Sequence, residues 1–170
     1  VKAVPTNGPT VLIGETSVPQ AKEELLGMLK EQGIETIDAI TLLPDKKALD
    51  GKIYGVIRIP VGTLRYGPSY ASEQATQLLM GTPVRILKKE GWYLVQTPED
   101  YVSWVSSSSV EPMTRQQFNE YLSHKKLIFL SDEGWIYEKP DASSARIASV
   151  VVGALLLDKG SKGKYAHVEL

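Results

Sequence analysis

The sequence predicts a mainly β fold in which a small α+β element precedes two copies of one compact β unit. Apolar residues recur with a helical period near the N-terminus, whereas short strand-like segments separated by Gly, Pro and Asp dominate from residue 53 onward. Residues 54–110 also resemble residues 127–170, and a repeat of this length fixes the architecture. We expect four parts. Residues 1–52 form an N-terminal element that packs on the β units, residues 53–110 the first unit, residues 111–125 a linker helix and residues 126–170 a second, incomplete unit.

The repeat has a constant offset of 72 residues through most of its length. Three positions of the first copy and their counterparts in the second show it: Leu64 and Ile136, Pro68 and Pro140, Gly81 and Gly153. One extra residue in the next loop then places Trp92 on Tyr165. Residues 101–105 close the first copy and have no counterpart before Leu170. We therefore expect the sequence to be the front part of a longer protein, with residues 150–170 either paired with another element or poorly ordered.

The N-terminal segment predicts a β-α-β element. Residues 10–13 and 35–43 are rich in the β-branched and aliphatic residues that favour strands. Between them, apolar residues recur at spacings of three and four and form one helical face. Ser17 followed by Gln20 resembles a capping box at the helix start, and Gly33 suits its end.

Five short strands are expected in the first β unit, separated by Gly, Pro and Asp, with residues 63–72 as a loop. The expected strands cover residues 54–59, 76–79, 84–88, 92–96 and 101–105. Such spacing is typical of a small barrel or sandwich. Thr114 and Gln117 resemble a second capping box, which would begin the helix between the two units.

Composition narrows the classes of function. The net charge is −1, so no global field attracts nucleic acid or a membrane surface, and no apolar run approaches the roughly 18 residues of a membrane span. The absence of cysteine leaves this chain without a thiol nucleophile or a zinc–thiolate site. His124 and His167 lie in no known catalytic motif. We therefore expect no catalytic residue, metal site or cofactor, and no enzyme activity of this chain alone.

Ordered motifs in the first unit resemble bacterial SH3-like domains. They are Leu64-Arg65, then Gly81-Thr82-Pro83-Val84, then Gly91-Trp92-Tyr93-Leu94-Val95, then Tyr101-Val102-Ser103-Trp104-Val105. With the N-terminal element and the repeat, they also resemble the front of NlpC-type cysteine peptidases, over about residues 11–170. Members of that family cut γ-D-glutamyl–diamino acid bonds in cell-wall peptides. The resemblance implies two tandem SH3-like β-barrels, the second incomplete.

The sequence departs from that family in ways that limit what carries over. The peptidase domain with its Cys and His is absent, Glu99-Asp100 stands where the family often has Asp-Gly, and Tyr165 replaces Trp92 in the second copy. The resemblance therefore implies an accessory module of a cell-wall (peptidoglycan) hydrolase, not an activity of this chain. It also implies the cell envelope or periplasm, with the cytoplasm as the alternative.

Candidate substrate-binding residues come from two regions of the first unit. Arg65, Tyr66 and Tyr70 lie in the predicted loop, and Tyr and Arg are common anchors of recognition surfaces. A guanidinium can also pair two-pronged with a substrate carboxylate. The alternatives are that Arg65 pairs with a neighbouring acid and that Tyr66 covers the barrel end.

The closing strand supplies the other candidates. The resemblance implies that a Tyr near Tyr101 faces the peptidase cleft and helps recognise the free amine end of the substrate, which suits a phenol. The alternative makes Trp104 a core residue and Tyr101 a rim residue. Trp92 and Tyr93 alternate along a strand, so one of them faces outward. The substrate-binding candidates are Tyr101, Tyr66, Arg65, Tyr70 and Trp92.

Three functions remain open at this point. The leading hypothesis is a substrate-positioning module whose partners are murein peptide and a downstream or separate peptidase domain, with the first SH3-like unit bordering the cleft. The second is a stand-alone protein that binds peptidoglycan or a partner peptide. The third is an enzyme with unrecognised chemistry. The basic, glycine-rich loop at residues 159–164 is either a solvated turn or a contact for an anionic polymer.

Overall fold

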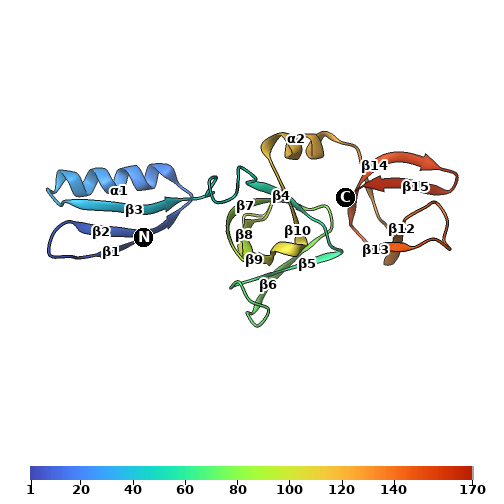
Figure 1. Ribbon diagram of the computed structural model, residues 1–170, viewed down its shortest axis with the longest axis horizontal. Helices are drawn as coiled ribbons and strands as arrows, with labels where there is room; N and C mark the ends of the chain where they lie inside the picture. The colour runs from blue at the N-terminus through green and yellow to red at the C-terminus, as the bar shows by residue number, and fades with distance from the viewer. Residues whose placement is uncertain (170) are drawn as a thin grey trace. The chain divides into compact units, whose positions relative to one another are not determined.

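The computed structural model describes residues 1–169 and divides into two compact units, Val1–Lys47 and Ala48–Leu170 (Figure 1). Strands outweigh helices in the described chain, so the predicted mainly β fold is confirmed. No helix within residues 1–169 combines the length and the apolar character needed to cross a membrane. Each unit is described below by itself.

The N-terminal unit is a three-stranded sheet with one helix along a face (Figure 1). Its elements are β1 (Lys2–Val4), β2 (Thr10–Thr16), α1 (Pro19–Glu31) and β3 (Thr36–Leu42). β2 and β3 pair in parallel, and α1 supplies the crossover that parallel strands require. Lys22 fastens α1 to β3, because its Nζ lies 2.7 Å from Asp38 Oδ2 and donates to the Ile40 carbonyl at 2.7 Å.

Of the two predictions made for the ends of α1, one is confirmed and the other is wrong. Gly33 follows the helix with φ of 70°, a left-handed conformation that glycine adopts without strain, as the sequence predicts. The capping box at Ser17 is wrong, because Val18 is the N-cap and has no side-chain cap. Thr16 Oγ1 instead accepts from the Val18 N–H, and Pro19 opens the helix with its fixed φ.

The first copy of the repeat is one antiparallel sheet. Its strands are β4 (Tyr54–Ile57), β5 (Val61–Arg65), β6 (Gln74–Leu79), β7 (Pro83–Glu90), β8 (Trp92–Gln96), β9 (Val102–Ser106) and β10 (Val110–Met113). They pair in the order β10-β4-β7-β8-β9-β5-β6, and a short 3₁₀ helix (Ser107–Ser109) joins β9 to β10. The core contains Ile57, Leu64, Ile86, Val95 and Val105, all fully buried.

The predicted loop at residues 63–72 is partly wrong, because it begins inside β5. Leu64 is fully buried and pairs with both β6 and β9. The sequence did not predict β5 here because Gly62 lowers the strand propensity of the segment. Here it serves packing: a Cβ at Gly62 would lie 3.1 Å from a methyl carbon of Ile57.

The helix α2 (Arg115–Ser123) begins with the predicted capping box, in which Thr114 and Gln117 bond reciprocally. It packs on the first copy. The Phe118 ring stacks on Tyr54 with centroids 4.6 Å apart, and the Tyr121 hydroxyl donates to the Gly81 carbonyl. Burial raises the pKa of Tyr121, which keeps this hydroxyl a donor.

The second copy repeats the strands of the first but arranges them in two sheets. The strands are β11 (Lys126–Ile128), β12 (Glu133–Tyr137), β13 (Arg146–Val151), β14 (Leu155–Lys162) and β15 (Tyr165–Glu169). β11, β14 and β15 form one sheet, and β12 and β13 form the other.

Strand register repeats along with the sequence. The pairing Val61–Leu79 in β5–β6 recurs as Glu133–Val151 in β12–β13, and the bulge after Leu64 recurs after Ile136. Pairings of β4–β7 recur in β11–β14, and those of β7–β8 in β14–β15, at the offsets of the sequence repeat. The two copies therefore share one folding pattern down to the pairing of single residues.

The copies contact each other through the turns that begin their long strands. Gly81 and Gly153 hold matching positions with φ of 84° and 85°. The Leu155 N–H donates to the Met80 carbonyl at 2.9 Å. Met80 is fully buried, yet it belongs to the core of the second copy with Val150, Ala154 and Leu156. The first copy thus completes part of the second copy's core.

Candidate functional site

The outer face of the first copy's sheet carries most of the predicted binding residues. Side chains alternate along β8, so Tyr93 and Val95 are buried and Trp92 and Leu94 face outward. Residues paired across adjacent strands share a face. One such row runs across four strands: Lys88, Leu94, Trp104 and Arg65.

A second row on this face runs through Glu90, Trp92 and Ser106. Tyr70 from the β5–β6 loop closes over it. Its ring meets Trp92 edge-on with centroids 4.8 Å apart, and its hydroxyl donates to Ser106 Oγ at 3.3 Å. We name the surface formed by Arg65, Tyr70, Lys88, Trp92 and Trp104 the aromatic face.

The charge on this face comes from Lys88 and Arg65. Lys88 Nζ lies 5.2 Å from the centroid of the Trp104 ring, within cation–π range, and 2.9 Å from Glu90 Oε1. The Arg65 guanidinium donates to the Ser72 carbonyl at 2.6 Å. That bond ties the two ends of the loop carrying Tyr66 and Tyr70, so Arg65 positions the loop instead of pairing with the acid that one sequence interpretation gave it.

The structure gathers three of the five candidates and separates the other two. Arg65, Tyr70 and Trp92 share the aromatic face. Tyr66 is 67% exposed on the same loop. Tyr101 is 58% exposed in the turn before β9, and its N–H donates to Thr97 Oγ1. It precedes Trp104 by three residues, about 10 Å along an extended chain.

Sequence reasoning missed the position of Trp104 and the role of Lys88. The alternative that makes Trp104 a core residue is wrong, because Trp104 is partly exposed while its neighbours Ser103 and Val105 are buried. The sequence did contain a signal for this position. Side chains alternate along β9 as they do along β8, so Trp104 must face away from Ser103 and Val105. Nothing local marks Lys88, which reaches Trp104 through strand pairing alone.

The aromatic face has the kinds of side chain that are suited to binding. Indole and phenol rings offer flat surfaces for apolar groups and ammonium ions, and Lys88 offers a cation for carboxylates. Within residues 1–169 no cluster of three His, Cys, Asp or Glu side chains could hold a metal ion. The face therefore resembles a recognition surface.

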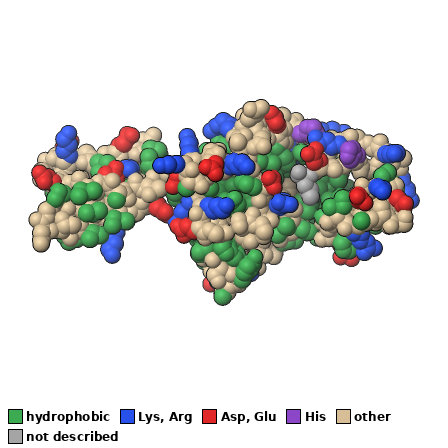
Figure 2. Space-filling model, in the orientation of Figure 1, with side chains coloured by type: hydrophobic (Ala, Val, Ile, Leu, Met, Phe, Trp, Pro, Cys, Tyr) green, Lys and Arg blue, Asp and Glu red, His purple; other side chains and the backbone are tan. Residues whose placement is uncertain are grey.

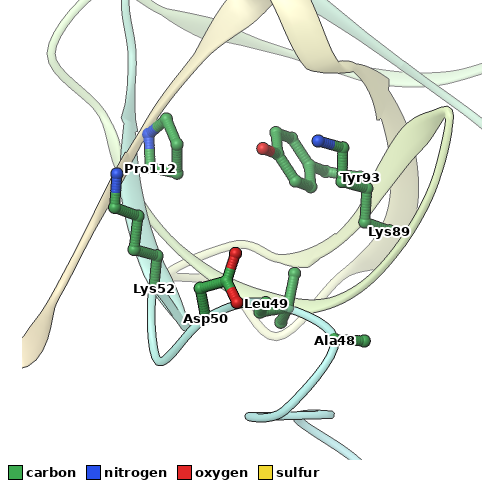
Figure 3. A pocket seen from close by; sticks show the side chains of 7 residues that line it. All are labelled: Ala48, Leu49, Asp50, Lys52, Lys89, Tyr93 and Pro112. Atoms are coloured by element: carbon green, nitrogen blue, oxygen red, sulfur yellow. The ribbon is translucent and has the colours of Figure 1, made fainter.

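Two hollows lie elsewhere in the larger unit. A cavity of about 230 Å³ is lined by Lys52 and Pro112 on one side and by Tyr93 and Lys89 on the other, with Asp50 between them (Figure 3). None of the predicted binding residues lines it. A larger groove of about 680 Å³ lies in the second copy, between strands of its two sheets.

The fold defines a class, a mainly β protein with SH3-like units, and the first of these units carries the aromatic face. Comparison sharpens this: residues 64–110 match the family described as the bacterial dipeptidyl-peptidase Sh3 domain. That segment holds the whole aromatic face. No curated protein matches the sequence.

Two solved structures share the fold. An NlpC/P60 family protein from Bacillus cereus ATCC 10987 aligns with a TM-score of 0.56 and 16% identity over 69% of this chain and 51% of its own. A novel NlpC/P60 endopeptidase from Photobacterium damselae subsp. piscicida aligns with a TM-score of 0.50 and 15% identity over 75% of this chain and 33% of its own. The chain thus spans about half or less of the solved proteins it resembles, and likeness at these identities shows the fold alone.

Proposed function

We propose that this chain is an accessory, substrate-positioning module of a bacterial cell-wall cysteine peptidase of the NlpC type. The observation that carries the proposal is the match of residues 64–110 to a peptidase-associated SH3 family, over the segment that forms the aromatic face. The shared fold with two NlpC/P60 proteins supports it. The chain has no cysteine, so the thiol nucleophile belongs to a peptidase domain outside these residues.

The proposed ligand is a murein peptide with a γ-D-glutamyl–diamino acid bond. Such a peptide carries carboxylates, an ammonium and short apolar groups. Trp92, Trp104 and Tyr70 offer ring faces and edges to the apolar and ammonium groups, and Lys88 offers a positive charge to a carboxylate. Exposed Tyr101, at the turn before β9, is the candidate for the substrate's free amine end.

Positioning follows from holding one end of the peptide while a separate domain cuts it. A fixed ligand presents its scissile bond in one orientation, which lowers the entropic part of the barrier. The first SH3-like unit would also border the cleft and reject peptides that lack the matching free end, since their buried polar groups would stay unpaired. Such a module acts in the cell envelope or periplasm, with the cytoplasm as the alternative compartment.

The alternative is a stand-alone protein that binds peptidoglycan or a peptide without assisting catalysis. The same aromatic face supports it. The two functions differ in one measurable respect: a positioning module raises kcat/KM of the peptidase domain for murein tripeptide, whereas a stand-alone binder leaves that rate unchanged or lowers it by sequestering the peptide.

Binding of the tripeptide L-Ala-γ-D-Glu-diamino acid by calorimetry and NMR tests the proposal. We expect millimolar to high-micromolar binding that weakens at least about fivefold in Trp92→Ala, because stacking on a ring contributes about 1 kcal/mol. Trp135→Ala is the matched control, since Trp135 is a half-exposed tryptophan of the second copy, stacked under Arg146. Equal losses of affinity in both variants would contradict the proposal. So would an absence of binding at 10 mM peptide, which is about ten times the highest Kd expected.

A further inference from the structure

The hollow of about 230 Å³ in the larger unit is built by three separate segments (Figure 3). Its walls come from the turn before β4, from the β7–β8 hairpin and from β10. The volume lies below the roughly 300–1,000 Å³ of pockets for drug-sized ligands, so an occupant has to be a small molecule. The polar residues of the lining are Asp50, Lys52, Lys89 and Tyr93.

The Tyr93 hydroxyl points into this hollow and lacks a partner. Tyr93 is 7% exposed and packs in the core of the first copy, and Figure 3 shows its oxygen directed into the hollow. Within residues 1–169 no protein group forms a hydrogen bond with that oxygen. The hydroxyl of a tyrosine buried to this degree ordinarily has a partner. The hollow is the place from which a ligand can supply one.

Two opposite charges flank that hydroxyl. Asp50 directs its carboxylate into the hollow, and Lys52 extends along the wall beside Pro112 (Figure 3). Both side chains are exposed, and in the described part of the chain neither forms an ion pair. The turn that carries them is fixed, because the Lys52 N–H donates to the Leu49 carbonyl at 2.8 Å and Leu49 is buried in the core. An acid, a base and a phenol thus surround one small space.

The charges of the hollow favour a molecule that carries both signs. Lys89 adds a second positive group, with its Nζ 5.5 Å from the centroid of the Tyr93 ring. A simple anion would meet the Asp50 carboxylate, and a simple amine would meet two lysines. Figure 2 shows Lys and Arg side chains interspersed with Asp and Glu over the visible face of the larger unit, so no field of one sign overrides this local preference.

We propose that this hollow binds a small free amino acid. The Tyr93 hydroxyl and Lys52 donate to its carboxylate, and Asp50 accepts from its ammonium. In a free amino acid both charges sit on one carbon and fit so small a space, whereas in a peptide they lie at opposite ends. The side chain is short and apolar, because Leu49 and Pro112 form the apolar part of the lining. The site is separate from the aromatic face and does not rest on the function proposed for it.

The probes are L-alanine, propionate, which lacks only the ammonium, and ethylamine, which lacks only the carboxylate. Each is titrated near neutral pH into the full ¹⁵N-labelled chain and followed by the backbone amide signals of Asp50 and Tyr93. We expect L-alanine to bind with a Kd of about 1–10 mM, propionate at least about threefold more weakly and ethylamine more weakly still. Propionate or ethylamine binding as tightly as L-alanine would overturn the proposal, and so would unmoved signals at about 100 mM L-alanine.

Tyr93→Phe tests the hydroxyl, because it removes the oxygen and keeps the ring in the core. Tyr54→Phe is the matched control, since Tyr54 is a half-buried tyrosine of the same unit that stacks on Phe118 and does not line the hollow. We expect Tyr93→Phe to weaken L-alanine binding at least about tenfold, because a hydrogen bond to a charged group is lost, and Tyr54→Phe to leave it unchanged. Equal affinities in the two variants would overturn the proposal.

Asp50→Asn tests the place of the ammonium. Asparagine tolerates the left-handed backbone that Asp50 adopts, with φ of 48°, so the turn is kept. We expect this variant to bind L-alanine about threefold more weakly and propionate no more weakly than before, whereas Lys52→Gln weakens both. Lys47→Gln is the control for lysine, since Lys47 is exposed and lies outside the lining. A loss of propionate binding in Asp50→Asn as large as that of L-alanine would overturn the proposal.

Discussion

The two copies of the repeat share their strand pairing but differ in the side chains that this pairing brings together on the outer face. The first copy is one continuous sheet closed by β9, and its outer face presents Arg65, Tyr70, Lys88, Trp92 and Trp104. At the equivalent places the second copy has Tyr137, Ala142, Gly160 and Tyr165, with no described counterpart of Trp104. The copies therefore share their strand register but differ at these positions of the aromatic face.

The interiors have diverged as well. Ile53 and Ile86 are buried together in the first copy, and the Ile86 N–H donates to the Ile53 carbonyl. The second copy keeps that backbone bond but replaces the pair with Lys125 and Asp158, whose Nζ and Oδ2 lie 2.7 Å apart. The first copy thus relies on apolar packing where the second relies on charge, which makes their stabilities respond to different perturbations.

The largest expected effect comes from the glycine turns that join the copies. A Cβ at Gly81 would lie 2.2 Å from the Leu155 carbonyl oxygen, whereas one at Gly153 would meet the side-chain end of Leu79 at 2.8 Å. We expect Gly81→Ala to lower the free energy of unfolding by more than about 3 kcal/mol, since a backbone clash adds to left-handed strain. Gly153→Ala should cost about half of that, because a leucine side chain can move.

Gly91→Ala isolates the strain from the clash, because Gly91 has φ of 72° and open space around it. Its expected cost is about 1 kcal/mol. Urea unfolding curves of the three variants measure the series. A Gly81→Ala protein as stable as Gly91→Ala would show that the two copies do not meet as described.

The next largest loss of stability is expected where β9 closes the first copy. Val105 is fully buried between β5 and β8, so Val105→Ala should cost about 2 kcal/mol through lost transfer energy and a cavity. Val168 lines the open groove of the second copy, so Val168→Ala should cost less than about 1 kcal/mol. Thermal unfolding compares them, and the reverse order would contradict the difference in burial between the two valines.

Acid should act on the second copy through Asp158. The hydrogen bond from Lys125 holds the pKa of the Asp158 carboxyl below its usual range. A lowered folded pKa gives stability that is present above the unfolded value, about 4, and is lost as pH falls through the folded pKa. Asp158→Asn should therefore flatten the decline in urea midpoint below about pH 4. Asp141→Asn should act in the same direction, since bonds from Ser143 also lower the pKa of Asp141.

The smallest expected effect is that of Tyr70→Phe. This change removes the 3.3 Å bond to Ser106 and keeps the ring on Trp92. We expect a loss of stability under about 0.5 kcal/mol, because the bond is exposed and long. Tripeptide affinity should stay within about twofold, by contrast with Trp92→Ala. A large loss of affinity would assign the Tyr70 hydroxyl, and not its ring, to the ligand.

Much of the fold could be predicted because its signals are local or repeated. The offset between Gly81 and Gly153 foretold the repeated strand order, and Thr114 with Gln117 foretold the start of α2. The expected division into four domains remains a prediction, since the structure separates only the units that meet between Lys47 and Ala48.

The site was predictable only in part, because its geometry comes from pairing across strands. Alternation alone indicated that one of Trp92 and Tyr93 faces outward, and the structure shows that it is Trp92. The row that joins Lys88, Trp104 and Arg65 requires the registers of four strands, including β5, which Gly62 concealed. The role of Arg65 as a loop tie depends on the path of the chain to Ser72, which the sequence does not reveal. Whether any of the five candidates binds ligand stays a prediction.

The three tryptophans of the chain allow one direct measurement of the central claim. In a ¹⁵N-labelled sample each indole N–H gives its own signal, and the tripeptide L-Ala-γ-D-Glu-diamino acid is added stepwise. The account predicts that the Trp92 and Trp104 signals move together along one binding curve while the Trp135 signal stays in place. Movement of Trp135 alone, or no movement of Trp92 and Trp104 at saturating tripeptide, would contradict it.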